Sequence, residues 1–159
     1  AVLNNLASVY ISIDDYKAAK RYNENAIKVR IAKLGVVHPL VAQSFNNSGI
    51  IFEAQGKFEE AEEAYKKALG IFEEKFDKDH YLSFSSVINL ANLKYKKREY
   101  LSALEIYQRA LDIQEKRKPA DKQKTLSILS KLYEVSMKVN DAQKATEIKE
   151  KMNKVKDKL

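Results

Sequence analysis

Small side chains recur along this chain every 42 residues, and this period constrains the fold more than any other feature. Three sets of positions carry Ala or Gly at that spacing: Ala7, Gly49 and Ala91; Ala19, Ala61, Ala103 and Ala145; and Ala26, Ala68 and Ala110. A repeat of this length is one supersecondary unit that cannot bury its apolar face alone and stacks on its neighbours. The sequence therefore predicts a repeat architecture.

Within each repeat, the apolar residues follow the 3.6-residue period of an α-helix in two successive segments. In the second repeat, Phe45, Ile51 and Phe52 belong to one segment, and the apolar positions between 58 and 72 belong to the other. We expect two antiparallel helices per repeat. The small residues should lie where two helices approach to the near end of the usual 8–10 Å or so.

Residues suited to turns and helix ends separate the two segments. Gly56 and Asn140 suit a left-handed helix end, and Asp14 and Asp15 suit the start of the following helix. The predicted repeats span residues 1–34, 42–76, 84–118 and 126–159 and form a single array. The last repeat keeps Ala145 but departs from the pattern elsewhere, so it would suit a C-terminal cap.

The segment from 34 to 76, LGVVHPLVAQSFNNSGIIFEAQGKFEEAEEAYKKALGIFEEKF, resembles the 42-residue repeats of kinesin light chains. These repeats are a subclass of the tetratricopeptide repeat (TPR) family. The resemblance rests on five matches to the TPR signature: Gly49, Phe52, Phe58, Ala61 and Ala68. It implies an all-α fold, a right-handed α-solenoid of antiparallel helix pairs. It also implies a scaffold for protein–protein interaction.

The chain departs from this signature at several positions. The third repeat has Lys94 in place of an aromatic residue and DKDHYLSFS in place of the His-Pro linker. The first repeat has Asn23 at a position that is normally apolar. Ser48 occupies the position that Leu6 and Leu90 fill in the neighbouring repeats, and nothing in the sequence explains a serine there.

Composition narrows the functional classes. The chain has a net charge of +7 with a basic excess mainly in its C-terminal half, which favours either an acidic partner or a solvated Lys-rich surface. It has no cysteine, no signal-peptide pattern and no apolar run long enough to cross a membrane, so we expect a cytoplasmic protein. It begins without Met, inside the periodic pattern, which suggests a fragment of a longer protein.

No constellation of catalytic residues is recognisable in the sequence. His38 and His80 lie 42 residues apart, which indicates exposed linker residues encoded by the repeat and not a metal pair. There is no Gly-rich phosphate loop, nucleophile elbow or HExxH motif. We therefore expect no enzymatic activity, no cofactor and no metal site.

The candidate site is the concave groove that the first helices of TPR units line in proteins of that family. Transferring the groove positions to this chain gives a set rich in amide side chains: Asn4, Asn5, Ser8, Asn46, Asn47, Ile50, Asn89, Asn92, Tyr95, Lys96, Lys131 and Lys138, within a wider set that adds Ser12, Gln43, Glu53, Ser85, Ser127 and Glu134. Among these, Asn5, Asn47 and Asn89 are one repeat apart and form a predicted ladder.

An amide side chain both donates and accepts hydrogen bonds, so a row of amides suits the main chain of an extended peptide. Lys96, Lys131 and Lys138 would add a preference for acidic residues. The resemblance implies the same role, because asparagines at these positions hold peptides in related proteins. The alternative is a polar helix face without a ligand. Asn is costly inside a helix compared with Lys, Glu or Gln, which favours the ligand interpretation.

Three functional hypotheses remain open. The first is a non-catalytic scaffold that binds an extended peptide of a partner protein in the groove, as a kinesin light chain-like cargo adaptor would. The second is a structural element that self-associates through its open ends or an apolar surface. The third, nucleic-acid binding, follows from the pI of 9.3 and from the analogy with helical-repeat RNA readers, whose repeats are nearer 35 residues and lack this Ala pattern.

Overall fold

The computed structural model describes residues 2–117 and 121–157. Over these residues the chain forms eight α-helices, one short 3-10 helix and no strand, which confirms the all-α class. The elements are α1 (Val2–Ser12), α2 (Tyr16–Leu34), α3 (Pro39–Ala54), α4 (Phe58–Lys75), η1 (Tyr81–Ser83), α5 (Phe84–Lys96), α6 (Tyr100–Lys116), α7 (Lys122–Lys138) and α8 (Ala142–Lys156). The predicted repeat boundaries at residues 1, 118 and 159 lie outside the described residues.

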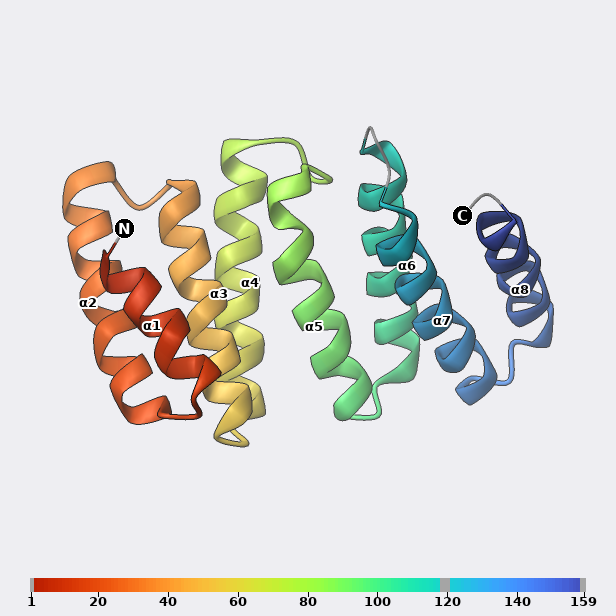
Figure 1. Cartoon of the computed structure of the whole chain (residues 1–159), viewed down its shortest axis with the longest axis horizontal. Coiled ribbons are helices and arrows are strands. Elements are labelled where there is room, and N and C mark those ends of the chain that lie inside the picture. Colours follow the sequence, from red (N-terminus) through yellow and green to blue (C-terminus); the bar gives the residue numbers. More distant parts are fainter. Residues whose placement is uncertain (1, 118–120, 158–159) are drawn as a thin grey trace. The chain divides into compact units, whose positions relative to one another are not determined.

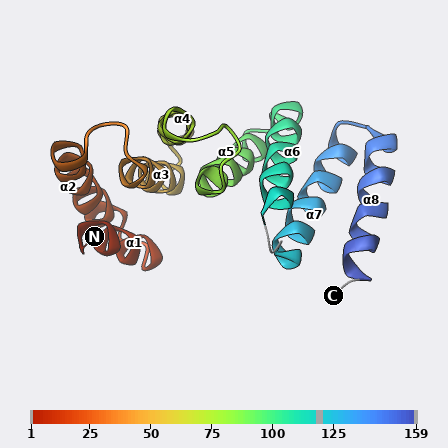
Figure 2. The same cartoon turned by 90° about the horizontal axis from the view of Figure 1, so that it is seen from above.

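The helices group into two compact units, one ending at Asn89 and the other beginning at Leu90, so the division falls inside α5. In the first unit, α1 pairs with α2 and α3 pairs with α4, and α3 also packs against both α1 and α2 (Figures 1 and 2). In the second unit, α7 packs against α6 and α8. Each predicted repeat therefore contains two helices joined by a short turn.

The small residues of the 42-residue pattern lie in the core, as predicted. All ten positions are buried, and nine of them are alanines with at most 3% of their surface exposed. An alanine adds little width to a helix, so a neighbouring helix can pack closely against it. The period seen in the sequence is thus the period of helix–helix contact.

Each turn between the two helices of a repeat contains one residue in the left-handed conformation. Gly56 (φ 73°) and Asn140 (φ 58°) confirm the prediction. Asp14 (φ 59°) and Arg98 (φ 61°) occupy the equivalent positions, so the prediction that Asp14 starts a helix was wrong. Asp tolerates this conformation because its short polar side chain can hydrogen-bond locally, but Arg has no such advantage.

The residue after each left-handed position is the N-cap of the next helix. Asp15 accepts a hydrogen bond from the Ala18 backbone N–H at 3.0 Å, and Asp141 accepts one from Lys144 at 2.9 Å. Lys57 and Glu99 hold the same position in the described range 2–117 but make no side-chain cap. At the start of the second helix of a repeat, one backbone N–H therefore has a side-chain acceptor in the first and fourth repeats but not in the second and third.

Replacing Lys57 by Asn should stabilise the first unit by about 1 kcal/mol, because an amide oxygen at the N-cap can accept a free backbone N–H at the start of α4. Lys57→Ala is the matched control, since it also removes the cation but offers no acceptor. Urea denaturation followed by circular dichroism measures both variants. Equal stabilities of the Asn and Ala variants would contradict this role.

The two departures from the apolar pattern in the first and second repeats are partners in the structure. Asn23 is 1% exposed, and its Nδ2 donates to Ser48 Oγ at 2.8 Å and to the Ser44 carbonyl oxygen at 2.9 Å. Ser48 Oγ in turn donates to the same carbonyl oxygen at 3.2 Å. Ser48 therefore replaces the usual leucine because the buried Asn23 amide on α2 needs a hydrogen-bond partner on α3.

Candidate functional site: an amide-lined groove

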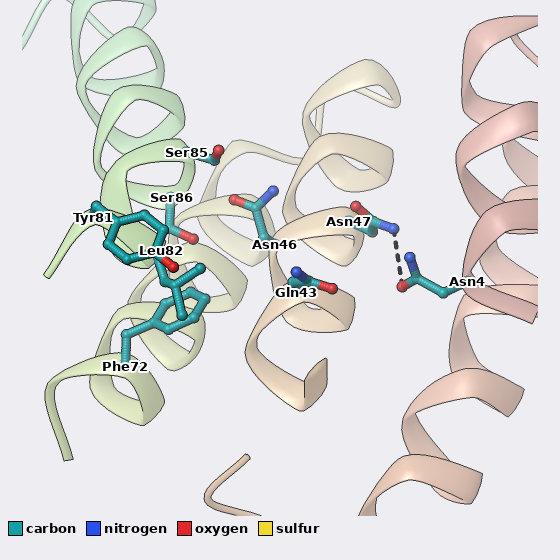
Figure 3. A pocket seen from close by; sticks show the side chains of 9 residues that line it. All are labelled: Asn4, Gln43, Asn46, Asn47, Phe72, Tyr81, Leu82, Ser85 and Ser86. Atoms are coloured by element: carbon teal, nitrogen blue, oxygen red, sulfur yellow. Dashed lines mark hydrogen bonds between the residues drawn. The ribbon is translucent and has the colours of Figure 1, made fainter. Parts of the chain in front are cut away.

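The first unit contains a pocket of about 260 Å³ between α1, α3 and the segment from 81 to 86 (Figure 3). Its apolar side consists of Phe72, Tyr81 and Leu82, and its polar side consists of Asn4, Gln43, Asn46, Asn47, Ser85 and Ser86. Such a site can hold an apolar group while pairing the polar groups around it.

Two histidines set where the segments that line this pocket begin. His38 is the N-cap of α3, and its Nδ1 accepts the Leu40 backbone N–H at 3.1 Å. His80 does the same for Leu82 at 3.3 Å, and its ring stacks on Phe76 with the centroids 4.2 Å apart. Both are half-buried rather than exposed, so one part of the prediction was wrong, but their linker role is confirmed.

Asn4 lies at the centre of a hydrogen-bond network that joins the first three helices. Its Oδ1 accepts from Arg30 at 2.9 Å, from Ser44 Oγ at 3.4 Å and from Asn47 Nδ2 at 3.4 Å. Figure 3 shows the Asn47 amide nitrogen pointing at this oxygen. Asn47 Nδ2 is also 3.5 Å from Ser8 Oγ, so α1 and α3 are linked along the groove.

A second amide pair continues the row. Asn89 Nδ2 donates to Asn46 Oδ1 at 3.1 Å. The hydrogen bonds between helices therefore join residues that are 43 apart, Asn4 to Asn47 and Asn46 to Asn89. The predicted ladder consists of residues 42 apart, so these bonds do not join its members to one another. Asn5 is exposed, and no hydrogen bond joins its side chain to another described residue.

Arg30 was not predicted as a residue of this site. Its side chain is 8% exposed, and the guanidinium donates to Asn4, to Ser44 Oγ at 2.8 Å and to the Leu40 carbonyl oxygen. Burial lowers the pKa of this guanidinium below its usual value. The sequence did contain a signal, because the equivalent position of the second repeat is the apolar Phe72, and a cation at a buried position needs several acceptors.

In the second unit, three of the predicted groove residues interact with each other. Tyr95 donates to Glu134, and Lys131 Nζ is 3.0 Å from the other oxygen of that carboxylate. The hydrogen bond from Tyr95 and then the Lys131 ammonium hold the pKa of Glu134 below its usual value. Asn92 accepts from the Tyr107 hydroxyl at 2.5 Å.

The structure thus brings the predicted residues together in two groups. The first unit groups Asn4, Ser8, Asn46, Asn47 and Asn89, and the second groups Tyr95 and Lys131 around Glu134, whereas Asn92 pairs with Tyr107. Ile50 is half-buried on α3, and Lys96 and Lys138 are exposed. Phe72, Tyr81, Leu82 and Ser86 line the pocket but were not predicted. For Tyr81 and Leu82, the only feature of the sequence that could have indicated a role in the pocket is that the segment around them departs from the His-Pro linker of the second repeat.

Two further observations concern other kinds of site. None of the helices within residues 2–117 and 121–157 is long and apolar enough to span a membrane. Over the same residues, no three His, Asp or Glu side chains gather in a way that could hold a metal ion.

The chain was compared with known proteins. A structure of BtubC (BKLC) from P. vanneervenii is similar, with a TM-score of 0.86 and 26% identity over 98% of this chain and 62% of BtubC. This chain therefore spans less than two thirds of the length of that protein. A structure described as a kinesin light chain with nearly identical TPR-like repeats, from Podosopora anserina, has a TM-score of 0.83 and 19% identity over 99% of this chain and 74% of its own. No curated protein sequence matches.

Two sequence models of the tetratricopeptide repeat match the chain, one over residues 1–74 and the other over residues 85–117, which together cover more than half of it. The buried Ala and Gly positions, the helix pairs and the similar structures agree with these matches. The chain belongs to the tetratricopeptide repeat family and has the α-solenoid fold of that family, and the structures similar to it include one described as a kinesin light chain.

Proposed function

We propose that this protein is a non-catalytic scaffold whose first unit binds an extended peptide segment of a partner protein. The observation that carries the proposal is the row of half-buried amides beside a pocket with an apolar side. An extended peptide can place one apolar side chain in the pocket and pair its main chain with the amides. The TPR family supports this assignment, since its members are typically protein–protein interaction scaffolds.

The finer proposal is a kinesin light chain-like cargo adaptor that acts in the cytoplasm. It is supported by the similarity to a structure described as a kinesin light chain. The preference for acidic partners is supported by the net charge of +7 and by the exposed Lys138. Lys131 contributes less to it than the sequence suggests, because Glu134 already lies 3.0 Å from its ammonium group.

Replacing both Asn47 and Asn89 by Ala should weaken peptide binding at least about tenfold while changing the stability by less than about 1 kcal/mol. Their inter-helix hydrogen bonds are long or half-buried, and Ala is the better helix former. The probe is a fluorescent dodecapeptide selected from a random display library on the wild-type protein. Fluorescence anisotropy measures its affinity, and urea denaturation measures stability.

The matched control is Asn25→Ala combined with Asn153→Ala, which changes two exposed asparagines on α2 and α8. This control should leave the affinity unchanged. A groove variant that lost stability but kept its affinity would show that these asparagines are structural and that the groove assignment is wrong.

One observation favours the second candidate function, self-association. Val2, Val9 and Ile13 lie on or just after α1 and are 71%, 53% and 62% exposed. The residues one repeat later than Val2 and Val9 are Ser44 and Ile51, which are buried in the first unit. Sedimentation at several concentrations tests this surface. A monomer at the highest concentration would exclude self-association.

A further inference from the structure

We propose that Arg30 is a positioning residue of the groove, which fixes the polarity of the Asn4 and Asn47 amides so that one presents a donor and the other an acceptor toward a bound peptide main chain. This inference rests on the proposed function. It assigns to Arg30 a role in the recognition of the peptide main chain.

The guanidinium group of Arg30 determines which atom of Asn4 faces it. Arginine has only donors, so the atom of Asn4 that faces Arg30 at 2.9 Å must be the carbonyl oxygen. Ser44 also holds this oxygen, at 3.4 Å. The Asn4 amide therefore cannot rotate by 180° without placing its NH₂ group against the buried cation. Its Nδ2 is left without a partner among the described residues and is available as a donor.

The polarity passes from Asn4 to Asn47. An oxygen at Asn4 requires a donor opposite it, so Asn47 turns its Nδ2 toward α1 and leaves its Oδ1 as an acceptor (Figure 3). The next pair has a defined polarity as well. Asn89 Nδ2 donates to Asn46 Oδ1, which leaves Asn46 Nδ2 as a donor and Asn89 Oδ1 as an acceptor.

From α1 to the first turns of α5, the row thus offers donor, acceptor, donor and acceptor at Asn4, Asn47, Asn46 and Asn89. The edge of an extended peptide offers C=O and N–H groups in alternation, and these belong to every residue type except proline, which lacks the N–H. The amide row therefore matches a backbone without regard to its sequence. The adjacent pocket would select one side chain.

Asn4→Asp tests this inference without disturbing the network. A carboxylate gives Arg30 and Asn47 the same oxygen acceptors, and it adds an ion pair with Arg30, so stability should be maintained or increased. The donor toward the groove is lost, however. We expect the affinity for the probe to fall about five- to tenfold, the value of one hydrogen bond to a bound ligand.

The probe is a dodecapeptide without Asp, Glu, Lys or Arg, selected on the wild-type protein and measured by fluorescence anisotropy, so that the new charge neither attracts nor repels it. Asn25→Asp is the matched control, because it introduces the same charge at an exposed asparagine on α2 that is not among the predicted groove residues. It should leave the affinity unchanged.

A second readout needs no peptide. In Arg30→Met, the Asn4 oxygen loses its shortest hydrogen bond and keeps only those at 3.4 Å, so the side-chain ¹⁵N–¹H₂ resonances of Asn4 and Asn47 should shift and broaden. Arg30→Lys keeps a cationic donor and should preserve more of the wild-type spectrum. Unchanged amide resonances in Arg30→Met would overturn the role of Arg30.

The outcomes separate this inference from the proposed function. An Asn4→Asp variant that folds and keeps the wild-type affinity, or an equal loss in Asn25→Asp, would overturn the amide polarity while leaving peptide binding intact. Failure to select any peptide, or a peptide whose affinity is insensitive to loss of Asn47 and Asn89, would overturn the proposed function and this inference with it.

Discussion

Gly49→Ala is expected to lower the free energy of unfolding of the first unit by about 2 kcal/mol, although Ala is the better helix former by about 1 kcal/mol. A Cβ atom at this position would lie 2.3 Å from Cε1 and 2.5 Å from Cδ1 of Tyr65. The ring is fully buried, and its hydroxyl donates to Glu53 at 2.9 Å, so both ends of the side chain are held. Overpacking therefore outweighs helix propensity.

The third repeat has an alanine at the position of Gly49 and shows how the neighbouring tyrosine lies in that case. Ala91 and Tyr107 occupy the positions of Gly49 and Tyr65, and both are buried. The hydroxyl groups of the two tyrosines have different partners. Tyr65 donates to Glu53, one helical turn after Gly49, whereas Tyr107 donates to Asn92, the residue directly after Ala91. An alanine at position 49 would force Tyr65 out of its present place and away from Glu53.

Gly70→Ala is the control for this experiment. Gly70 lies in α4, is exposed, and has nothing within 4 Å of an added Cβ, so the same substitution should stabilise the unit by about 1 kcal/mol. Urea denaturation of both variants measures the difference. A Gly49→Ala variant as stable as Gly70→Ala would contradict the close approach of α3 and α4.

The sequence predicted the helices and their contacts well because both depend on local, periodic features. Ala19, Ala61, Ala103 and Ala145 mark helix contacts at a fixed spacing, and the 3.6-residue period marks the helices. The left-handed turn residue was predicted at Gly56 and Asn140 but not at Arg98, because Arg has no preference for that conformation.

Polar residues in the core could not be interpreted from the sequence, because their partners lie on other helices. Ser48 and Asn23 each break the apolar pattern, and neither explains the other until α2 and α3 are packed together. The candidate site follows the same rule. Its amides could be found from their repeat positions, but the atom that Asn4 turns toward its neighbours depends on Arg30, which is 26 residues away in the sequence.

Arg30→Met is expected to destabilise the first unit by about 3 kcal/mol, the largest effect among these variants. Methionine fills much of the same volume, and removing a buried cation is favourable in itself. Three acceptors remain, however, at Asn4, Ser44 and Leu40, and Ser44 is fully buried. Asn4 and Leu40 keep the Ser44 hydroxyl as a weaker donor at 3.4 Å. Each of the three acceptors still loses a hydrogen bond to a charged group, which is worth about 1.5–3 kcal/mol, so the loss outweighs the gain.

The control is Arg21→Met, on the same helix and exposed, which should change the stability by no more than about 0.5 kcal/mol. Arg30→Lys should lie between the two, because an ammonium group also supplies several donors, but it lies one bond nearer the backbone than the Nη1 nitrogen that holds all three acceptors. Thermal and urea denaturation rank the three variants. If Arg30→Met were as stable as Arg21→Met, the network would not hold α1, α2 and α3 together, and the amide polarity that depends on it would lose its physical basis.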